Sequence, residues 1–357
     1  MLPASTSNYP SHSVPRDCNN LRAVWRCYRG GLGGFVGTIT SQTSGAIVLV
    51  RADEVLCENY GNLLVSRYRL KQAEGIALVR SNREEGRQSL AFVSRPFVLC
   101  GLPVRRPPAD QILFERRNGN FLLQITGHPQ FGLPFGQDRL VLVFLATLAV
   151  RQKCQVVRFR SAAEMLDTFG MAKGGKEYRR IVAAFERIFG ATIFFSTESS
   201  RTATTVIHRS RFSFLQEAEI WYSRTSSNPV GENTITLSDE FYAEMTAHPI
   251  PTDLEAVKVL AAAPALLDLY MWLGYRCFCA RGPESIPLFG PFGLTTQLGC
   301  VEYSRPSRFR AMLEQWLRTI RVLWPECPAA ISKDGKSLRI GYSYAIAPAM
   351  DSRPNSA

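Results

Sequence analysis

The sequence predicts an α+β fold in which one arrangement of helices and strands occurs twice, after an irregular N-terminal extension. Three observations lead to this prediction. The order helix, strand, helix, glycine turn, helix and hairpin can be followed across residues 133–213, and a similar order returns between residues 252 and 345. In both copies the helix before the hairpin is long and amphipathic, with basic side chains beside its apolar stripe. This is the order of tandem winged helix-turn-helix modules.

The chain divides into four predicted parts. They are an unassigned, partly disordered N-terminal extension (1–86), a first winged-helix DNA-binding domain (87–222), a second such domain (223–345) and a disordered tail (346–357). The extension contains a glycine cluster at 29–37, and its apolar stretches at 46–51 and 75–80 could be strands. Because neither domain takes a strand from the extension, we expect a fragment without residues 1–86 to fold.

The elements of the first domain follow from hydrophobic periodicity and turn residues. Strands are expected in AFVSRPFVLCGLPV and FLLQITG around the turn-rich RNGN, and LVLVFLATLAV at 140–150 predicts a buried helix. CQVVRFR predicts a short strand. A helix over 161–169, with Ser161 as its cap, leads through a glycine turn into a helix over 175–189. ATIFFSTE and TTVIHRSRFSFLQEAEIWYS then form two or three strands around a Ser/Thr-rich tip.

In the second domain, TITLSDEFYAEMTAH leads to a helix capped at Thr252, and Pro264 opens the next helix at a first-turn position. IPLFGPFGLTTQLG supplies a short strand and a short helix. The long helix of RPSRFRAMLEQWLRTIRVLWPE follows, and the Asp-Gly pair in KDGK favours a tight hairpin near the end.

The stretch GMAKGGKEYRR has the G-x-x-x-x-G-K spacing of a phosphate-binding loop at Gly170, Gly175 and Lys176. Such a loop needs a hydroxyl after the lysine, to hold magnesium, and a buried strand before the first glycine. Here Glu177 stands in the hydroxyl position, and an amphipathic helix precedes the loop. We therefore interpret the glycines as a helix end and a turn, and predict no nucleotide role for Lys176.

Charge favours a polyanionic partner. The chain has 42 Lys and Arg against 30 Asp and Glu, a net charge of +12. The excess is local, since residues 87–222 hold 19 basic and 10 acidic side chains, whereas residues 223–345 hold 12 of each. A basic domain beside a neutral one indicates a dedicated binding face.

No pattern predicts catalysis or a bound cofactor. The nine cysteines form no C-x-x-C pair, the four histidines have no partner at metal-binding spacing, and acids such as Asp253 lie at helix starts. We therefore expect no metal, no cofactor and no enzymatic activity. The longest apolar run, 140–150, is too short to span a bilayer, and the N-terminus lacks an apolar signal core, so a cytoplasmic protein is expected.

Two basic helices and two hairpin tips are the candidate DNA-binding elements. In the first domain the apolar stripe of Tyr178, Ile181, Phe185 and Ile188 faces the core, so that basic side chains remain for phosphates and base edges. The candidates there are Lys173, Lys176, Arg179, Arg180, Arg187 and, on the hairpin, Arg201, Arg209 and Arg211. In the second domain they are Arg305, Arg308, Arg310, Arg318 and Arg321, with Lys333 and Lys336 on the hairpin. An ordinary solvated face is the alternative for each.

From about residue 90 to 345 the sequence resembles the RepA-type replication initiators of bacterial plasmids. The stretches that carry the resemblance are RRNGNFLLQI, GLPFGQDRLVLVFLATLAVR, GGKEYRRIVAAFERIFGATI and HPIPTDLEAVKVLAAAPALLDLYMWLGYR. The resemblance implies a tandem winged-helix protein that binds repeated sites at a plasmid origin, helps to open AT-rich DNA and brings in host replication proteins such as a helicase or initiator. A second copy of the chain is a further candidate partner. Residues 1–86 do not match the family.

Two other functional classes stay open. A winged-helix transcriptional repressor would use the same helices without opening DNA, so origin opening distinguishes it from an initiator. An enzyme would reveal itself by ATP hydrolysis or by nicking of the origin.

Overall fold

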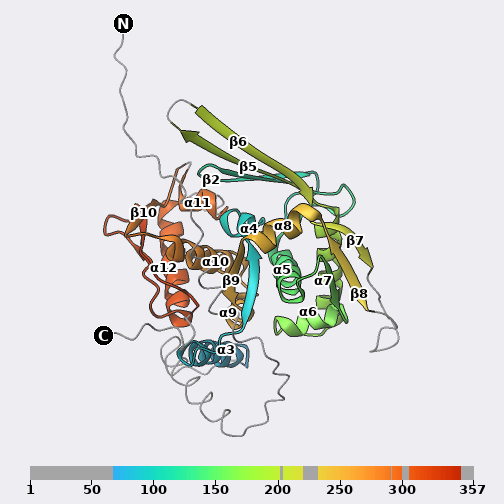
Figure 1. The fold of residues 1–357 in the computed structure, drawn as a ribbon. Helices are drawn as coiled ribbons and strands as arrows, with labels where there is room; N and C mark the ends of the chain where they lie inside the picture. The colour runs from blue at the N-terminus through green and yellow to red at the C-terminus, as the bar shows by residue number, and fades with distance from the viewer. Residues whose placement is uncertain (1–66, 202–203, 220–231, 291, 300–304, 347–357) are drawn as a thin grey trace, which may run out of the picture.

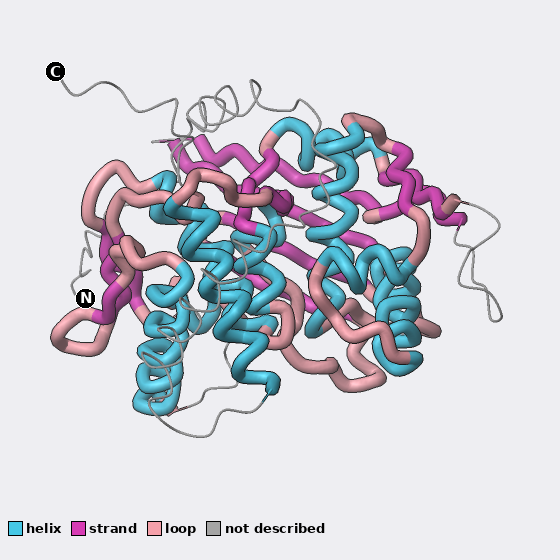
Figure 2. Tube along the Cα trace, turned by 90° about the horizontal axis from the view of Figure 1, so that it is seen from below, coloured by secondary structure: helices cyan, strands magenta, loops and turns pink. Residues whose placement is uncertain are grey.

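The computed structural model describes residues 67–201, 204–219, 232–290, 292–299 and 305–346. The fold is α+β, as predicted, with several small sheets. Seen from below, the helices gather in front and most strands lie behind them or at the edges (Figure 2). The predicted glycine cluster at 29–37, the apolar stretch at 46–51 and the tail beyond residue 346 lie outside the described residues.

The first half of the described chain contains the elements of the first predicted domain and one helix before them. In order they are α3 Arg67–Glu84, β1 Leu90–Ser94, α4 Arg95–Leu99, β2 Leu113–Asn118, β3 Phe121–Thr126, the 3₁₀ helix η1 Gly136–Asp138, α5 Arg139–Gln152, β4 Val156–Phe159, α6 Ala162–Thr168, α7 Gly175–Gly190, β5 Thr192–Arg201, β6 Thr204–Ser213 and β7 Leu215–Glu219. The buried helix, the short strand, the two helices around the glycine turn and the hairpin are thus confirmed as elements.

The second half follows the predicted order as well. Its elements are β8 Asn233–Leu237, α8 Asp239–Ala247, β9 Pro249–Asp253, α9 Leu254–Leu260, α10 Pro264–Cys279, β10 Glu284–Pro287, α11 Leu294–Gln297, α12 Pro306–Leu323, β11 Ala330–Ile331 and β12 Ser337–Ile340. The strands form four sheets, with the orders β1-β9, β4-β8-β7, β2-β3-β5-β6 and β10-β12-β11.

Strand β1 joins the two predicted domains. It pairs antiparallel with β9, from Leu90 opposite Asp253 to Ser94 opposite Pro249, so a strand of the first domain is completed by a strand of the second. In Figure 1 this pair lies between α5, α6 and α7 on one side and α10 and α12 on the other. The chain segments on either side of residue 222 are therefore connected by backbone hydrogen bonds.

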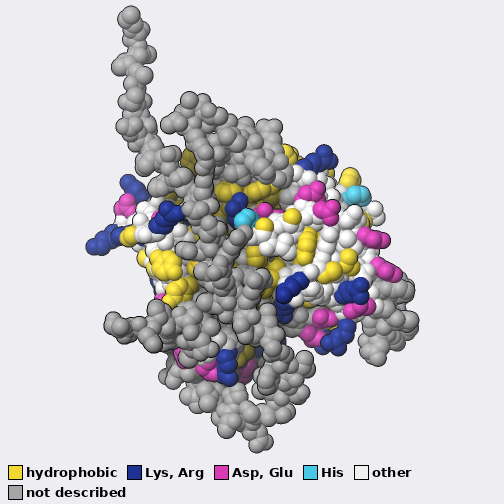
Figure 3. All heavy atoms as spheres, viewed as in Figure 1, with side chains coloured by type: hydrophobic (Ala, Val, Ile, Leu, Met, Phe, Trp, Pro, Cys, Tyr) yellow, Lys and Arg dark blue, Asp and Glu magenta, His cyan; other side chains and the backbone are white. Residues whose placement is uncertain are grey.

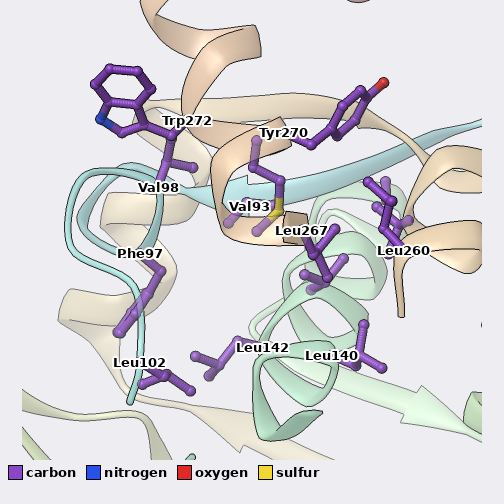
Figure 4. Close-up of a cluster of buried hydrophobic side chains, with 14 of the residues drawn as sticks. Val93, Phe97, Val98, Leu102, Leu140, Leu142, Leu260, Leu267, Tyr270 and Trp272 are labelled. Atoms are coloured by element: carbon purple, nitrogen blue, oxygen red, sulfur yellow. The ribbon is translucent and has the colours of Figure 1, made fainter. Parts of the chain in front are cut away.

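The hydrophobic core is also shared. Val93 from β1, Phe97 from α4, Leu142 from α5, and Leu267 and Trp272 from α10 are all at most 5% exposed and belong to one cluster (Figure 4). Burial of one such side chain contributes roughly 1.5–3 kcal/mol. A core made from both halves of the sequence holds α5 and α10 side by side.

Helix α3 lies inside the segment that the sequence leaves unassigned. The apolar stretch at 75–80, which the sequence suggested as a strand, is helical because Ala73, Ile76 and Ala77 repeat at helical spacing and are buried in the core. Gly75 allows close packing, since a Cβ there would lie 2.8 Å from Val259 Cγ2. Part of the predicted extension therefore belongs to the folded core.

Two further expectations need correction. The stretch expected to be extended after Ser94 contains the short helix α4, which begins with a proline in its first turn. The cap of α9 is Asp253 rather than Thr252, because its carboxylate accepts hydrogen bonds from the backbone N–H groups of Glu255 and Ala256.

Candidate nucleic-acid interface

The first candidate surface begins at the glycine turn between α6 and α7. Gly170 has φ +61°, a left-handed conformation that ends α6, and Gly174 precedes the first turn of α7. A helix, and not a strand, therefore precedes the G-x-x-x-x-G-K spacing, as the sequence predicted. That Lys176 has no nucleotide role remains a prediction.

Helix α7 is anchored by its apolar side. Ile181, Phe185 and Ile188 of the predicted stripe are buried, and so is Ala184. Phe189, at the end of the helix, is 44% exposed. The anchoring leaves the opposite face of the N-terminal turns to solvent.

That opposite face is basic. Lys176, Arg179 and Arg180 are exposed on it, and Lys173 is exposed in the turn before the helix. The Lys173 Nζ lies 2.7 Å from Asp167 Oδ1, in an ion pair whose two side chains are both more than half exposed. Such a surface pair is weak enough to exchange its partner for a phosphate. The structure thus brings four of the predicted residues together at the start of α7.

Arg187 does not share this exposure. It lies eleven residues after Lys176, three helical turns along the same side of α7, but its side chain is only 13% exposed. Its Nε and Nη2 donate to Asp138 Oδ2 and Oδ1 at 2.6 and 2.8 Å, and its guanidinium lies 4.7 Å from the Phe135 ring centroid. The loop that contains η1 therefore covers the C-terminal end of the face, and Arg187 is bound within the protein.

The hairpin β5–β6 follows α7 directly. Its register pairs Thr192 with Ser213 at the base and Arg201 with Thr204 at the tip. Strand β3 pairs with β5 only as far as Thr197, so the last part of the hairpin extends beyond its sheet (Figure 1). Arg211 is exposed on β6 opposite Phe194. The side chains of Arg201 and Arg209 lie outside the described atoms.

The second candidate surface surrounds α12. Here helix α10, strand β10, helix α11, helix α12 and the strands β11 and β12 follow in turn, and β12 lies between β10 and β11 in their sheet. Phe309, Leu313, Leu317, Ile320 and Leu323 bury one side of α12. Met312 and Trp316 are partly buried against the same core.

The arginines of α12 divide into two groups. Arg305, at the N-cap, and Arg308 and Arg318 are exposed to solvent. Arg310 and Arg321, eleven residues apart, lie on the flank beside the hairpin. Arg321 Nη2 donates to the carbonyl oxygen of Ala329 at 2.6 Å, and the Arg310 guanidinium lies 5.8 Å from the Phe289 ring centroid. Arg321 is exposed as well, although Ala329 holds its guanidinium, and Arg310 is half-buried near Gly335 of the hairpin turn. The first group therefore offers exposed guanidinium groups to a ligand, whereas those of the second group lie against the protein.

The tip of the second hairpin is a tight turn at Asp334 and Gly335, as KDGK predicted, with Gly335 at φ +66°. Asp334 Oδ1 accepts hydrogen bonds from the Ser332 hydroxyl and from the Lys336 N–H. These bonds hold the pKa of Asp334 below its usual range. Lys333 and Lys336 are exposed on either side of this carboxylate.

Basic side chains do not form one continuous patch on the face shown in Figure 3. On the face shown in Figure 3 they occur singly or in small groups among hydrophobic and acidic side chains. The candidate interface is therefore defined by α7, α12 and the two hairpins, and not by overall charge.

Within the described ranges, no group of three or more His, Cys, Asp or Glu side chains could hold a metal ion. No helix in the part of the chain with described coordinates combines the length and apolar character needed to cross a membrane. The absence of a cofactor and of enzymatic activity remains an expectation.

Sequence reasoning missed the role of Asp138. An acidic residue before a helix is ordinarily explained by the helix dipole, and no pattern in the sequence pairs it with an arginine 49 residues away. The aromatic and acidic residues of the loop PFGQD become informative only when the fold places them against α7.

One protein family matches part of the chain. Residues 102–255 match the family model described as Replication initiator protein A, which confirms the resemblance to replication initiators over this part of the chain and supports a replication initiator role. The matched segment includes α7 and the β5–β6 hairpin. No curated protein matches the sequence significantly.

Two crystal structures match the chain at low identity and with TM-scores below 0.5. Domains 2 and 3 of RctB, as selenomethionine derivatives, are 16% identical with a TM-score of 0.46, covering 70% of this chain and 99% of that one. RctB residues 155–483, comprising the same domains, are 15% identical with a TM-score of 0.43, covering 67% of this chain and 92% of that one.

Proposed function

We propose that the chain is a plasmid replication initiator that binds repeated duplex sites at an origin through two winged helix-turn-helix units. The observation that carries the proposal is the match of residues 102–255 to replication initiators, because the matched segment contains the helix-turn-helix with its exposed basic face. The proposed cellular setting is the bacterial cytoplasm.

The first unit runs from α5 to β6. Its order of helix, strand, helix, turn, helix and hairpin is that of a winged helix, in which the helix after the turn enters the major groove. Lys176, Arg179 and Arg180 are the proposed contacts from α7, and Arg201, Arg209 and Arg211 those from the hairpin. Lys173 is proposed to exchange Asp167 for a phosphate.

The second unit runs from α10 to β12. In its sheet the strand before the helix pair lies beside the last strand of the hairpin, as in a winged helix. Arg305, Arg308 and Arg318 are the proposed contacts from α12, with Lys333 and Lys336 at the hairpin tip. Arginine suits bidentate reading of guanine. Arg310 and Arg321 are proposed to keep their contacts beside the hairpin and not to bind DNA.

Two units in one chain gain affinity from their linkage, which fits binding to repeated sites. Opening of adjacent AT-rich DNA and recruitment of host replication proteins complete the proposed role. Self-association on the DNA is part of the same proposal, since repeated sites place several copies side by side.

The first test is duplex binding. Fluorescence anisotropy with directly repeated origin segments should give log affinity falling linearly with log salt, with a slope of about −0.9 for each phosphate neutralised. With about 6 to 10 phosphate contacts the affinity should fall by about 10³- to 10⁵-fold between 50 and 200 mM salt. A flat salt response would exclude the proposed surface.

The second test separates an initiator from a repressor. Permanganate footprinting of a supercoiled origin plasmid detects unpaired thymines, and the purified protein should create them beside the repeats. A protein that protects the repeats without any permanganate reactivity would be a repressor. Hydrolysis of ATP or nicking of the same plasmid would indicate an enzyme.

A further inference from the structure

Three consecutive residues at the start of the first unit contact different parts of the protein. Gln137 Nε2 donates to the carbonyl oxygen of Ala261 at 2.8 Å, in the connection between α9 and α10. Asp138 binds Arg187 of α7, and Arg139 binds Asp268 of α10. The segment Gln137–Arg139 therefore contacts the first unit through its middle residue and the second half of the chain through its outer two.

The ion pair between Asp138 and Arg187 is buried, and two hydrogen bonds join the two side chains. The Asp138 side chain is 4% exposed, and both of its oxygens accept hydrogen bonds from the Arg187 guanidinium. Asp138 Oδ2 also accepts the Phe135 N–H at 2.9 Å. A planar guanidinium bound at two points fixes direction as well as distance, so α7 cannot rotate without breaking the pair.

The Arg139 connection is more deeply buried. Arg139 and Asp268 have side chains that are 5% and 6% exposed, with Nε 2.8 Å from Oδ1 and Nη2 2.9 Å from Oδ2. Nη2 also donates to the Leu102 carbonyl at 2.8 Å. A Cβ on Gly101 would collide with the Asp268 carboxylate, so the backbone at Gly101 approaches the pair closely.

These contacts connect the two helices proposed to read DNA. Helix α7 is held directly through Arg187. Helix α12 belongs to the same unit as α10, and its buried side chains share the hydrophobic core with those of α10. Figure 1 shows α7 and α12 on opposite sides of α5 and α10. The position of α7 relative to α12 therefore depends on how α5 and α10 are held together.

We propose that the segment Gln137–Arg139 sets the distance and orientation between α7 and α12, and thereby the spacing between half-sites that the protein accepts. The inference rests on the proposed DNA-binding function. Insertion of one base pair moves the second half-site by about 3.4 Å and rotates it by about a tenth of a turn. Only a protein with rigidly coupled readers distinguishes such a change. Gln137, Asp138 and Arg139 are positioning residues, and Arg187 is one as well.

In vitro selection from a random duplex library tests the proposal, because it requires no known origin sequence. The wild-type chain should select two half-sites at a single spacing. D138N, which keeps the volume of Asp138 but removes its charge, should select the same half-sites over a range of spacings. In anisotropy titrations, one inserted base pair should lower wild-type affinity by about tenfold or more and that of D138N by less than about threefold, because linkage itself contributes about 10²- to 10⁴-fold.

R180A is the matched control. Arg180 lies on the exposed face of α7, so its loss should weaken binding at every spacing alike and leave the selected spacing unchanged. If D138N does not fold, Q137A and R187K carry the same test, because each loosens one connection while keeping most of the packing. Thermal melts monitored by circular dichroism establish which variants are folded.

The outcomes separate the two proposals. If wild type selects a spaced pair and the folded variants keep its single spacing, the coupling inference is wrong while the DNA-binding function stands. If wild type selects no two-part site, both are wrong.

Discussion

Arg187 of α7 and Asp138 at the end of η1 form a two-point ion pair, with nitrogen to oxygen distances of 2.6 and 2.8 Å. The sequence predicted Arg187 as a DNA contact because it lies off the apolar stripe of α7. In the fold its guanidinium is instead enclosed by Phe135 and Asp138. Loss of one partner leaves a buried charge without compensation, which is costly.

R187A should therefore act on stability. We expect the free energy of unfolding to fall by about 3 kcal/mol, since removal of one partner of a buried pair typically costs about 3–5 kcal/mol and Arg187 keeps some exposure. Urea denaturation monitored by circular dichroism measures this free energy. R180A, a matched control on the same helix, should change stability by no more than about 0.5 kcal/mol. If R187A is as stable as wild type but binds DNA with lower affinity, Arg187 is a DNA contact after all.

The comparison of Arg180 with Arg187 shows what the sequence can predict. Periodicity identified the apolar stripe of α7 and therefore the face opposite to it, and both arginines lie on that face. It could not predict that a loop beginning fifty residues earlier covers one end of the face. The elements themselves were predictable because caps, glycines and prolines act locally. The β1–β9 pair was not, since its partners are separated by most of the chain.

The contribution of α3 to the folded core could not be predicted from the sequence for a related reason. Its sequence is polar on average, and its buried apolar side chains include Ala73, Ile76, Ala77 and Val79. Arg83 illustrates the point, because its side chain is 8% exposed and its Nη2 donates to the Tyr344 carbonyl at 3.0 Å. No local sequence pattern predicts a contact between residues that are 261 positions apart.

Two truncations test the contribution of α3. A fragment beginning at residue 67 should fold as the full chain does. Removal of residues 1–86 should lower stability by roughly 4 kcal/mol or more, or prevent folding. Ile76 and Val79 alone bury side chains that contribute about 1.5–3 kcal/mol each. Thermal melts and solubility of the two fragments provide the comparison. Equal stability would mean that α3 is dispensable, as the sequence suggested.

Asp253 should make stability depend on pH. Burial raises the pKa of Asp253, although Gln88 and the N–H groups of Ala256 and Glu255 oppose the shift. Between the pKa of the unfolded chain, about 3.9, and the raised folded value, the native state binds more protons than the unfolded state. This contribution to stability is therefore fully present at low pH and is lost as pH rises through that window.

D253N should remove this dependence while keeping the helix cap, because the amide oxygen still accepts the two N–H groups and Gln88 can turn its own amide. D253A loses the cap and should cost about 1 kcal/mol or more at every pH. Urea unfolding from about pH 4 to 7 gives the slope of the free energy of unfolding against pH for each variant. If wild type and D253N lose stability in parallel across that range, Asp253 is not the group responsible.

The tip of the second hairpin offers a test by gain of affinity. Asp334 is ionised at neutral pH, and hydrogen bonds from Ser332 and Lys336 lower its pKa further. D334N keeps the acceptor for these bonds and removes a negative charge between Lys333 and Lys336. Duplex affinity should rise about twofold to fivefold at about 0.1 M salt, where charges within about 10 Å still interact. K336Q should change it in the opposite direction. An unchanged affinity in both variants would place the tip away from the phosphates.

The two basic helices should read different parts of one site. Arg180 is exposed in α7 and Arg308 in the first turn of α12, close to the helix ends that enter the groove in winged-helix proteins. If each arginine binds a guanine, R180A and R308A should each lose about 1–3 kcal/mol of binding free energy and relax specificity at one position. A phosphate contact would instead weaken all sequences alike.

Hydroxyl-radical footprints on a single repeat distinguish the two helices. R180A should lose protection over one half of the repeat and R308A over the other, because each unit covers its own groove segment. R321A removes the same charge from α12 but on the flank bound to Ala329, so both halves should stay protected. If R180A and R308A lose the same half, or if R308A binds as wild type does, the second unit does not read DNA. Its exposed arginines would then form a surface for a second copy of the chain or for another replication protein.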